Sequence, residues 1–183
     1  MLISVAEFKT YAGLTGSSED TFIETLIKAA GGFMAEYLGR VIEETEIVER
    51  FNGDDIGSMI FLSNFPVTTF TWLKYRKGTY TDEQMTDFDD DDFEVDKDEG
   101  VVYVDNMYPG RRNIEAYYKA GYTTVNMPEA MKLACKKLVG NFYNGRRSDG
   151  FKSEEVAGSR IEWDKLMNDD IKSLLSPYLK IKI

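Results

Sequence analysis

The sequence contains no histidine and a single cysteine, Cys135, among its 183 residues. Without an imidazole, the chain cannot build a Ser-His-Asp or Cys-His catalytic site, nor a metal site that uses histidine ligands. One cysteine excludes an intrachain disulfide and a cysteine-rich zinc site. Cys135 falls on the apolar face of a predicted helix, so we expect it to be a core residue rather than a reactive thiol.

Long apolar runs are also missing. No stretch approaches the ~20 apolar residues that cross a bilayer, and the N-terminus lacks the basic-then-apolar pattern of a signal peptide. We therefore expect a cytoplasmic protein that does not enter a membrane. A phosphate-binding loop is absent too, because Gly53 and Gly57 are not followed by Lys-Ser or Lys-Thr. With no recognisable catalytic motif, we expect neither an enzyme nor a cofactor.

Basic residues are scarce relative to acidic ones, 22 against 32, which gives a formal net charge of −10. Residues 81–99 contain eleven acidic residues and one lysine, and this segment accounts for the whole excess. The other 164 residues carry 21 charges of each sign. Binding along nucleic acid rests on many Lys and Arg contacts to phosphates. The balance therefore argues against a generally basic DNA-binding surface, although local basic patches can exist.

What is present is a globular composition, with 43% hydrophobic and 13% aromatic residues. Apolar residues recur at helical spacing near both ends of the chain. Ser4 and Glu7 match a capping box at the start of the first helix. Ser17 or Ser18 is expected to cap the second helix, and Pro128 opens the third. The predicted helices span residues 4–12, 18–39, 128–145 and 162–175.

Between the second and third helices the apolar period changes from 3.6 to 2, which is the spacing of β-strands. A turn at residues 96–100 predicts a hairpin. Residues 146–158 are polar and contain glycine, so we expect a mobile loop there. The predicted strands are residues 45–51, 58–63, 67–75, 93–95, 101–105 and 113–118.

This order of elements predicts an α+β fold, in which N-terminal and C-terminal helices pack as a helical body with a central antiparallel β region. We expect a single domain. Its parts are the N-terminal helices (1–40), the β region (41–123) with its acidic loop (81–99), the C-terminal helices (127–175) and a tail (176–183).

The acidic segment invites comparison with a calcium-binding loop. If Asp87, Asp89 and Asp91 took the first three ligand positions of an EF-hand, Asp92 would stand where that loop requires glycine, and Asp98 where it uses a bidentate glutamate. A dedicated EF-hand is therefore not expected, and no metal is assigned. Loose cation binding by the first three aspartates and a solvated loop before a hairpin both stay open.

Two features point to contacts with partners. Arg146 and Arg147 follow the third helix, where they either cap its last carbonyl groups or contact an acidic protein or the DNA backbone. The tail alternates apolar and basic residues, so it either adds a strand to a neighbouring chain or frays. The other basic spots are Arg111, Arg112 and Arg160.

The order of several short motifs resembles the head-tail connector proteins of tailed bacteriophages and prophages, also called head-completion or adaptor proteins. The likeness covers nearly the whole chain, and the order and spacing of the motifs carry it, because each motif alone is common. The motifs are Leu2-Ile-Ser-Val-Ala-Glu-Phe-Lys9, Tyr37-Leu-Gly-Arg40, Phe65-Pro-Val67, Tyr118-Lys-Ala-Gly-Tyr122, Met127-Pro-Glu-Ala130, Asn141-Phe-Tyr-Asn-Gly-Arg146 and Leu174-Leu-Ser-Pro-Tyr-Leu179.

The resemblance implies a structural protein of the virion neck that assembles in the host cytoplasm. In this family about twelve copies form a ring beneath the portal, closed by heterologous contacts. The ring joins head to tail, contacts a tail or stopper protein, and extends the channel through which duplex DNA passes without sequence readout. Arg146 and Arg147 are then expected at subunit or channel contacts. The portal contact is expected from Pro177, Tyr178, Leu179, Ile181 and Ile183.

The long acidic segment is not a hallmark of that family, and it supports two alternative functions. One is a DNA-mimic inhibitor that presents the aspartates of residues 87–92 as phosphate surrogates to a nuclease or regulator. The other is a cation-binding interaction module, whose stability would rise with calcium.

Overall fold

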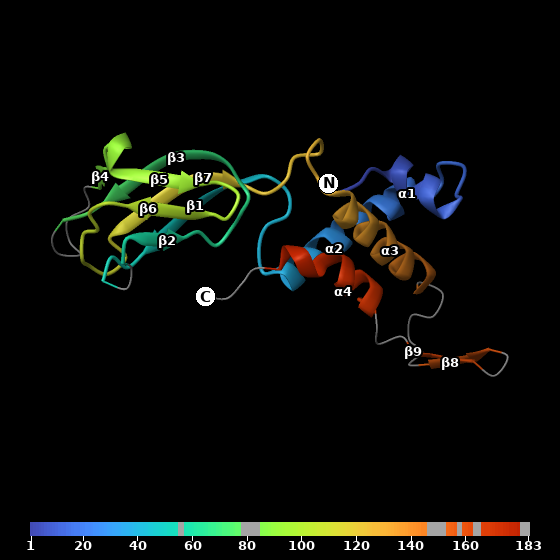
Figure 1. Ribbon diagram of the computed structural model, residues 1–183. Helices are drawn as coiled ribbons and strands as arrows, with labels where there is room; N and C mark the ends of the chain where they lie inside the picture. The colour runs from blue at the N-terminus through green and yellow to red at the C-terminus, as the bar shows by residue number, and fades with distance from the viewer. Residues whose placement is uncertain (55–56, 78–84, 146–152, 157–158, 163–165, 180–183) are drawn as a thin grey trace. The chain divides into compact units, whose positions relative to one another are not determined.

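The computed structural model describes residues 1–183 except 55–56, 78–84, 146–152, 157–158, 163–165 and 180–183. The chain forms two compact units. Residues 1–39 together with 124–183 make up the helical unit, and residues 40–123 make up the β unit. Helices and antiparallel sheets occur together, which confirms the predicted α+β class (Figure 1).

The helical unit is built around α3 (Glu129–Gly145), which packs against α1 (Val5–Ala12), α2 (Asp20–Leu38) and α4 (Asp169–Leu175) (Figure 1). The apolar faces of these helices form its core, and Cys135 is fully buried there. Among the described residues, no helix has both the length and the apolar character needed to cross a membrane. The most buried apolar residues of the unit include Phe8, Ile23, Ile27, Met34, Leu38, Met131, Leu138 and Ile171.

The first helix begins and ends as its sequence predicts. Glu7 N donates to Ser4 Oγ at 3.2 Å, and the Glu7 carboxylate accepts from Ser4 N at 2.7 Å, which completes the capping box. Gly13 ends α1 with a φ of 67°, in the left-handed region that glycine adopts without strain.

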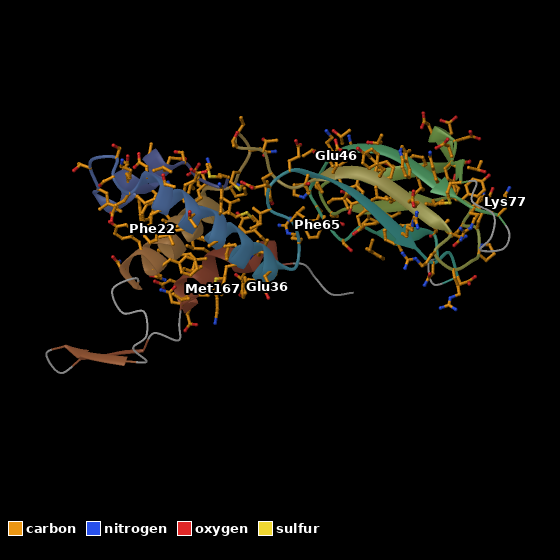
Figure 2. All side chains as sticks on the ribbon, turned by 180° about the vertical axis from the view of Figure 1, so that it is seen from behind. Phe22, Glu36, Glu46, Phe65, Lys77 and Met167 are labelled. Atoms are coloured by element: carbon orange, nitrogen blue, oxygen red, sulfur yellow. The ribbon has the colours of Figure 1, made fainter. Side chains whose placement is uncertain are left out.

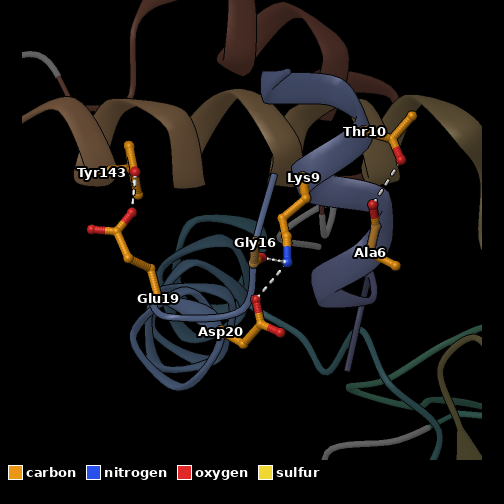
Figure 3. A network of polar contacts seen from close by, with 7 residues as sticks. All are labelled: Ala6, Lys9, Thr10, Gly16, Glu19, Asp20 and Tyr143. Atoms are coloured by element: carbon orange, nitrogen blue, oxygen red, sulfur yellow. Dashed lines mark hydrogen bonds and ion pairs between the residues drawn. The ribbon is translucent and has the colours of Figure 1, made fainter. Parts of the chain in front are cut away.

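The expected cap of α2 at Ser17 or Ser18 is wrong, because the N-cap is Glu19 and the helix begins at Asp20. Contacts from Lys9 of α1 explain why the residues before Asp20 form a turn instead of the first turn of the helix. Lys9 Nζ donates to Asp20 Oδ1 at 2.7 Å and to the Gly16 carbonyl, so the connection is held to α1 as a turn (Figure 3). Nearby, the Tyr143 hydroxyl of α3 donates to the Glu19 carboxylate (Figure 3). These polar contacts join three helices at one end of the unit.

The β unit contains two antiparallel sheets that face each other (Figure 1). The four-stranded sheet has the order β1-β7-β3-β4, and the three-stranded sheet has the order β2-β6-β5. The strands are β1 (Thr45–Phe51), β2 (Met59–Phe61), β3 (Val67–Tyr75), β4 (Thr86–Asp87), β5 (Phe93–Asp96), β6 (Val101–Val104) and β7 (Ile114–Ala120).

The core of the β unit lies between the two sheets. Ile60 and Val102 from one sheet and Leu73, Ala116 and Tyr118 from the other are all nearly inaccessible to solvent. Strand β3 is bulged between Phe70 and Trp72. Because a bulge shifts the alternation of side chains, Leu73 still faces the core opposite Ala116.

The ends of the β unit lie next to each other. Glu44 N donates to Tyr122 O at 3.1 Å, and Tyr122 N donates to Ile42 O at 2.7 Å. The polypeptide therefore leaves the helical unit after α2 and returns to it before α3 through adjacent segments.

The predicted hairpin in the acidic segment is confirmed. Strand β5 pairs with β6 in antiparallel register, with Phe93 opposite Val104 and Asp96 opposite Val101. The Asp96 carboxylate accepts from the amides of Asp98 and Glu99, and Gly100 closes the turn with a φ of 70°.

The prediction for residues 146–175 is wrong in two places. Part of the expected loop forms β8 (Ser153–Val156), which pairs with β9 (Ser159–Glu162). The last residue of β9, Glu162, is also where the last helix was expected to begin. The strands are two residues apart in sequence, a spacing typical of hairpins. Helix α4 begins only at Asp169, because the Asn168 side chain accepts from Ile171 N at 3.0 Å and caps it. A short 3₁₀ helix, η3 (Ser176–Tyr178), follows.

Candidate functional site

Three neighbouring strands of the four-stranded sheet begin or finish at the same end of that sheet. Phe51 at the end of β1 lies opposite Ile114 at the start of β7, and Ile114 lies opposite Tyr75 at the end of β3. Residues next to this row therefore become neighbours although they are far apart in sequence. Lys77, just beyond β3, marks this end of the unit, and Glu46 marks the opposite end (Figure 2).

Four arginines lie around this row and line an open hollow of about 1090 Å³. We call it the arginine hollow. Val48, Asn52 and Asn113 complete its lining. The arginines are Arg50, Arg76, Arg111 and Arg112.

Hydrogen bonds from Asn113 hold the floor of the hollow. Asn113 is 2% exposed, and its Oδ1 accepts from Gly53 N at 2.9 Å. Its Nδ2 donates to Tyr108 O at 2.8 Å and to Pro109 O at 3.2 Å. One buried side chain thus joins the loop after β1 to the loop before β7.

Backbone geometry makes the same two loops fit closely. A Cβ added to Gly53 would lie 1.9 Å from Tyr108 O, so only glycine allows this approach. Arg112 has a φ of 49°, and its amide donates to Asn52 Oδ1 at 2.8 Å. The arginines of the second loop are therefore presented from a fixed backbone.

Charges at the hollow are mainly positive. Arg50 pairs with Glu115, whose side chain is 12% exposed. Within the described part of the chain, neither Arg111 nor Arg112 forms an ion pair through its side chain. Lys77 lies over the stacked rings of Tyr75 and Tyr108, and a hydrogen bond with the Tyr108 hydroxyl raises the pKa of Lys77. Guanidinium groups in this arrangement suit carboxylate or phosphate groups.

The carboxylates on the same outer face already have partners. Hydrogen bonds from Tyr117 and Lys119 lower the pKa of Glu46 and keep it ionised. Lys119 Nζ lies 3.1 Å from Glu46 Oε1, and the same contact raises the pKa of Lys119. The paired charges of this face contrast with the excess of arginine in the hollow.

The structure separates the three aspartates considered for a cation. Asp87 lies in β4 and is 3.5 Å from Lys74 Nζ, whereas Asp89 and Asp91 are exposed at the start and within η1 (Asp90–Asp92). Among the described residues, no three acidic or cysteine side chains gather closely enough to hold a metal ion.

The other predicted contact residues are only partly described. Pro177 and Tyr178 lie in η3, and Leu179 follows it with 37% of its surface exposed. Arg160 lies in β9. Outside the described residues are Arg146, Arg147, Ile181 and Ile183.

Sequence reasoning identified Arg111 and Arg112 as a basic spot and missed the rest of the hollow. Arg50 and Arg76 are single bases in or beside strands, so no local cluster marks them. The alternation in residues 45–51 places Arg50 on the face opposite the core, which is a usable signal. The pairing of β1 and β3 with β7 was also needed to bring the four arginines together.

The described chain carries a β-sandwich with an arginine-lined hollow, inserted in the sequence between helices α2 and α3. The chain belongs to the head completion protein family, whose model matches residues 1–180. A comparison with curated protein sequences finds no match.

Solved structures contain chains of similar fold, and the following three are among them. A chain in the neck of an empty GTA particle computed with C6 symmetry has a TM-score of 0.68 and 17% identity, with 100% of this chain and 91% of that chain covered. A chain in the virion of a native gene transfer agent particle has a TM-score of 0.68, 18% identity and the same coverage. A chain in the neck of a native GTA particle computed with C12 symmetry has a TM-score of 0.66 and 16% identity, with 98% and 89% covered.

Proposed function

We propose that this protein is a structural component of the neck of a tailed phage or phage-like particle, where it forms a ring between the portal and the tail. The family match over residues 1–180 carries the proposal. Chains of the same fold in neck particles support it, and the C12 and C6 symmetries of those particles agree with a ring of about twelve copies. The role involves no catalysis.

In the proposed ring, the C-terminal segment contacts the portal. Exposed Pro177 and Leu179 at the end of the helical unit support this assignment. Duplex DNA passes through the ring without sequence readout, because the helical unit carries thirteen acidic and thirteen basic residues and offers no overall attraction to phosphate. A nanomolar, salt-sensitive affinity of the free protein for duplex DNA would contradict free passage.

The decisive experiment mixes the purified protein with the portal protein of its own particle and images the product by negative stain. We expect rings on one end of the portal, with the protein alone either monomeric or ring-forming. A variant truncated after Leu175 should keep the wild-type circular dichroism spectrum and lose portal binding. Failure of the full chain to bind portal, together with capture of a basic nuclease, would favour the DNA-mimic alternative.

A further inference from the structure

The net charge of the protein lies entirely in the β unit. Residues 40–123 contain nineteen acidic and nine basic residues, whereas the helical unit is balanced. Four of the nine basic residues line the arginine hollow. The β unit therefore carries a concentrated positive site on a strongly negative body.

Within the four-stranded sheet, the acidic segment and the Arg50 side of the hollow belong to opposite edge strands. Strands β7 and β3 separate edge strand β1, which carries Arg50, from edge strand β4. At the usual strand spacing, β1 and β4 are roughly 14 Å apart. The chain then passes from β4 through η1 into the second sheet.

The aspartates of this segment are available to another molecule. Asp89, Asp90 and Asp91 are exposed, and no side-chain ion pair joins them to any residue that the structure describes. The backbone that presents them is ordered by contacts with both sheets. Phe88 N donates to Leu73 O at 2.9 Å, and Asp105 N donates to Asp92 O at 3.0 Å.

We propose that the arginine hollow of one copy receives the exposed aspartates Asp89, Asp90 and Asp91 of a neighbouring copy. This inference rests on the proposed ring. Two different surfaces of one chain that complement each other produce a head-to-tail contact, which is the kind that closes rings. Arginine pairs with carboxylates in a planar, bidentate geometry, and the fixed loops of the hollow hold Arg111 and Arg112 ready for it.

Duplex DNA is the less suitable occupant. A polyanion approaching the β unit meets a body of net charge −10, which repels it at long range. The three aspartates form a short local group whose charge matches the hollow. The open hollow of about 1090 Å³ is slightly larger than a typical small-ligand pocket of roughly 300–1,000 Å³, so it has room for the side chains of a loop.

A chemical crosslink tests the contact directly. Arg111→Lys/Arg112→Lys keeps the charge of the hollow and introduces amines that a zero-length carbodiimide reagent joins to carboxylates. The variant is prepared unlabelled and ¹⁵N-labelled, and the two forms are mixed, crosslinked and digested for mass spectrometry. We expect mixed-isotope crosslinks from Lys introduced at 111 or 112 to the peptide containing Asp89, Asp90 and Asp91. If sedimentation shows only monomer, the reaction is run on the portal-bound assembly.

The chain supplies an internal control. Lys119 and Glu46 are 3.1 Å apart within one copy, so their crosslink should carry a single isotope. Crosslinks from positions 111 and 112 only to Glu115, or to carboxylates outside residues 89–91, would overturn the proposal. So would duplex DNA binding that depends on Arg111 and Arg112 in the absence of an intermolecular crosslink.

Charge reversal provides a second test. Arg111→Glu/Arg112→Glu should lower self-association by roughly tenfold or more, because it places like charges opposite each other. Mixing this variant with Asp89→Lys/Asp90→Lys/Asp91→Lys should restore the contact between unlike copies. If the arginine variant forms rings on the portal as efficiently as the wild type, the proposed contact between the hollow and the aspartates is wrong, while the proposed neck function is unaffected. If the wild type never binds portal, the proposed function itself fails.

Discussion

At the residue scale, a few buried polar groups hold the candidate site in place. Asn113 stands out because all of its side-chain partners are backbone groups of two separate loops. The hollow therefore depends on an amide at its floor as well as on the arginines around it.

Replacing Asn113 with alanine should destabilise the β unit. The change leaves Gly53 N and Tyr108 O without their partners, and each unsatisfied buried group costs about 1–3 kcal/mol. We expect the free energy of unfolding to fall by about 2–4 kcal/mol, measured from the urea midpoint. Asn52→Ala is the comparison variant, because the Asn52 side chain accepts from the exposed Arg112 amide rather than from a buried one. Equal losses in the two variants would show that Asn113 is not the main support of the floor.

The lowered pKa of Glu7 predicts that the stability of the protein depends on pH through the cap of α1. Hydrogen bonds from the Ser4 amide and hydroxyl lower the pKa of Glu7 below its ordinary value of 4.5. A folded-state pKa below the unfolded value means that this stabilisation is present above pH 4.5 and is lost as the pH falls through the lowered pKa. Glu7→Gln should therefore be less stable than the wild type at pH 7, and the gap should close under acid conditions.

Thermal unfolding from pH 7 to pH 3 checks this expectation. Glu24→Gln is the control, because Glu24 makes only an exposed pair with Lys28 in α2. A gap for Glu7→Gln that is independent of pH would contradict the role of the ionised carboxylate in the cap.

At the element scale, the sequence predicted best those segments whose signals are local. Strands β1 and β3 have the predicted bounds, and α1 has its predicted cap, because alternation and capping are visible in short windows. The predicted start of α2 was wrong because Lys9, which belongs to another helix, fixes the turn before α2. The arginine hollow was found only in part for the same reason, since strand pairing lies outside any window.

The acidic segment combines a structural turn with a solvated group. Asp96 accepts two backbone hydrogen bonds in the β5–β6 turn, whereas Asp90 is exposed. Asp96→Ala should lower the free energy of unfolding by about 1 kcal/mol, while Asp90→Ala should leave it nearly unchanged. Each variant removes one negative charge, so the overall electrostatic change is matched. Chemical denaturation measures the free energy of unfolding of both variants. An equal decrease in the two variants would show that the exposed aspartates are also structural.

At the scale of the whole molecule, the β unit has the features of an insertion between two helices. Its core cluster uses only residues between Ile47 and Tyr118 together with Ala120, all of which belong to the unit. Its first and last segments are hydrogen-bonded to each other, at Glu44 and Tyr122. The charge divides in the same way, because the unit holds the whole excess of ten negative charges.

A fragment of residues 40–123 should therefore fold alone. Its two sheets enclose a shared core, and its ends are already adjacent, so cutting both connections removes little of what stabilises it. We expect a cooperative urea transition and dispersed amide signals in a ¹H-¹⁵N spectrum. Adding salt should raise its stability, since salt screens the repulsion among the excess negative charges. The fragment carrying Asn113→Ala should unfold at lower urea by the same free energy as the full chain. A fragment without a cooperative transition would show that the helical unit is required for the sandwich to form.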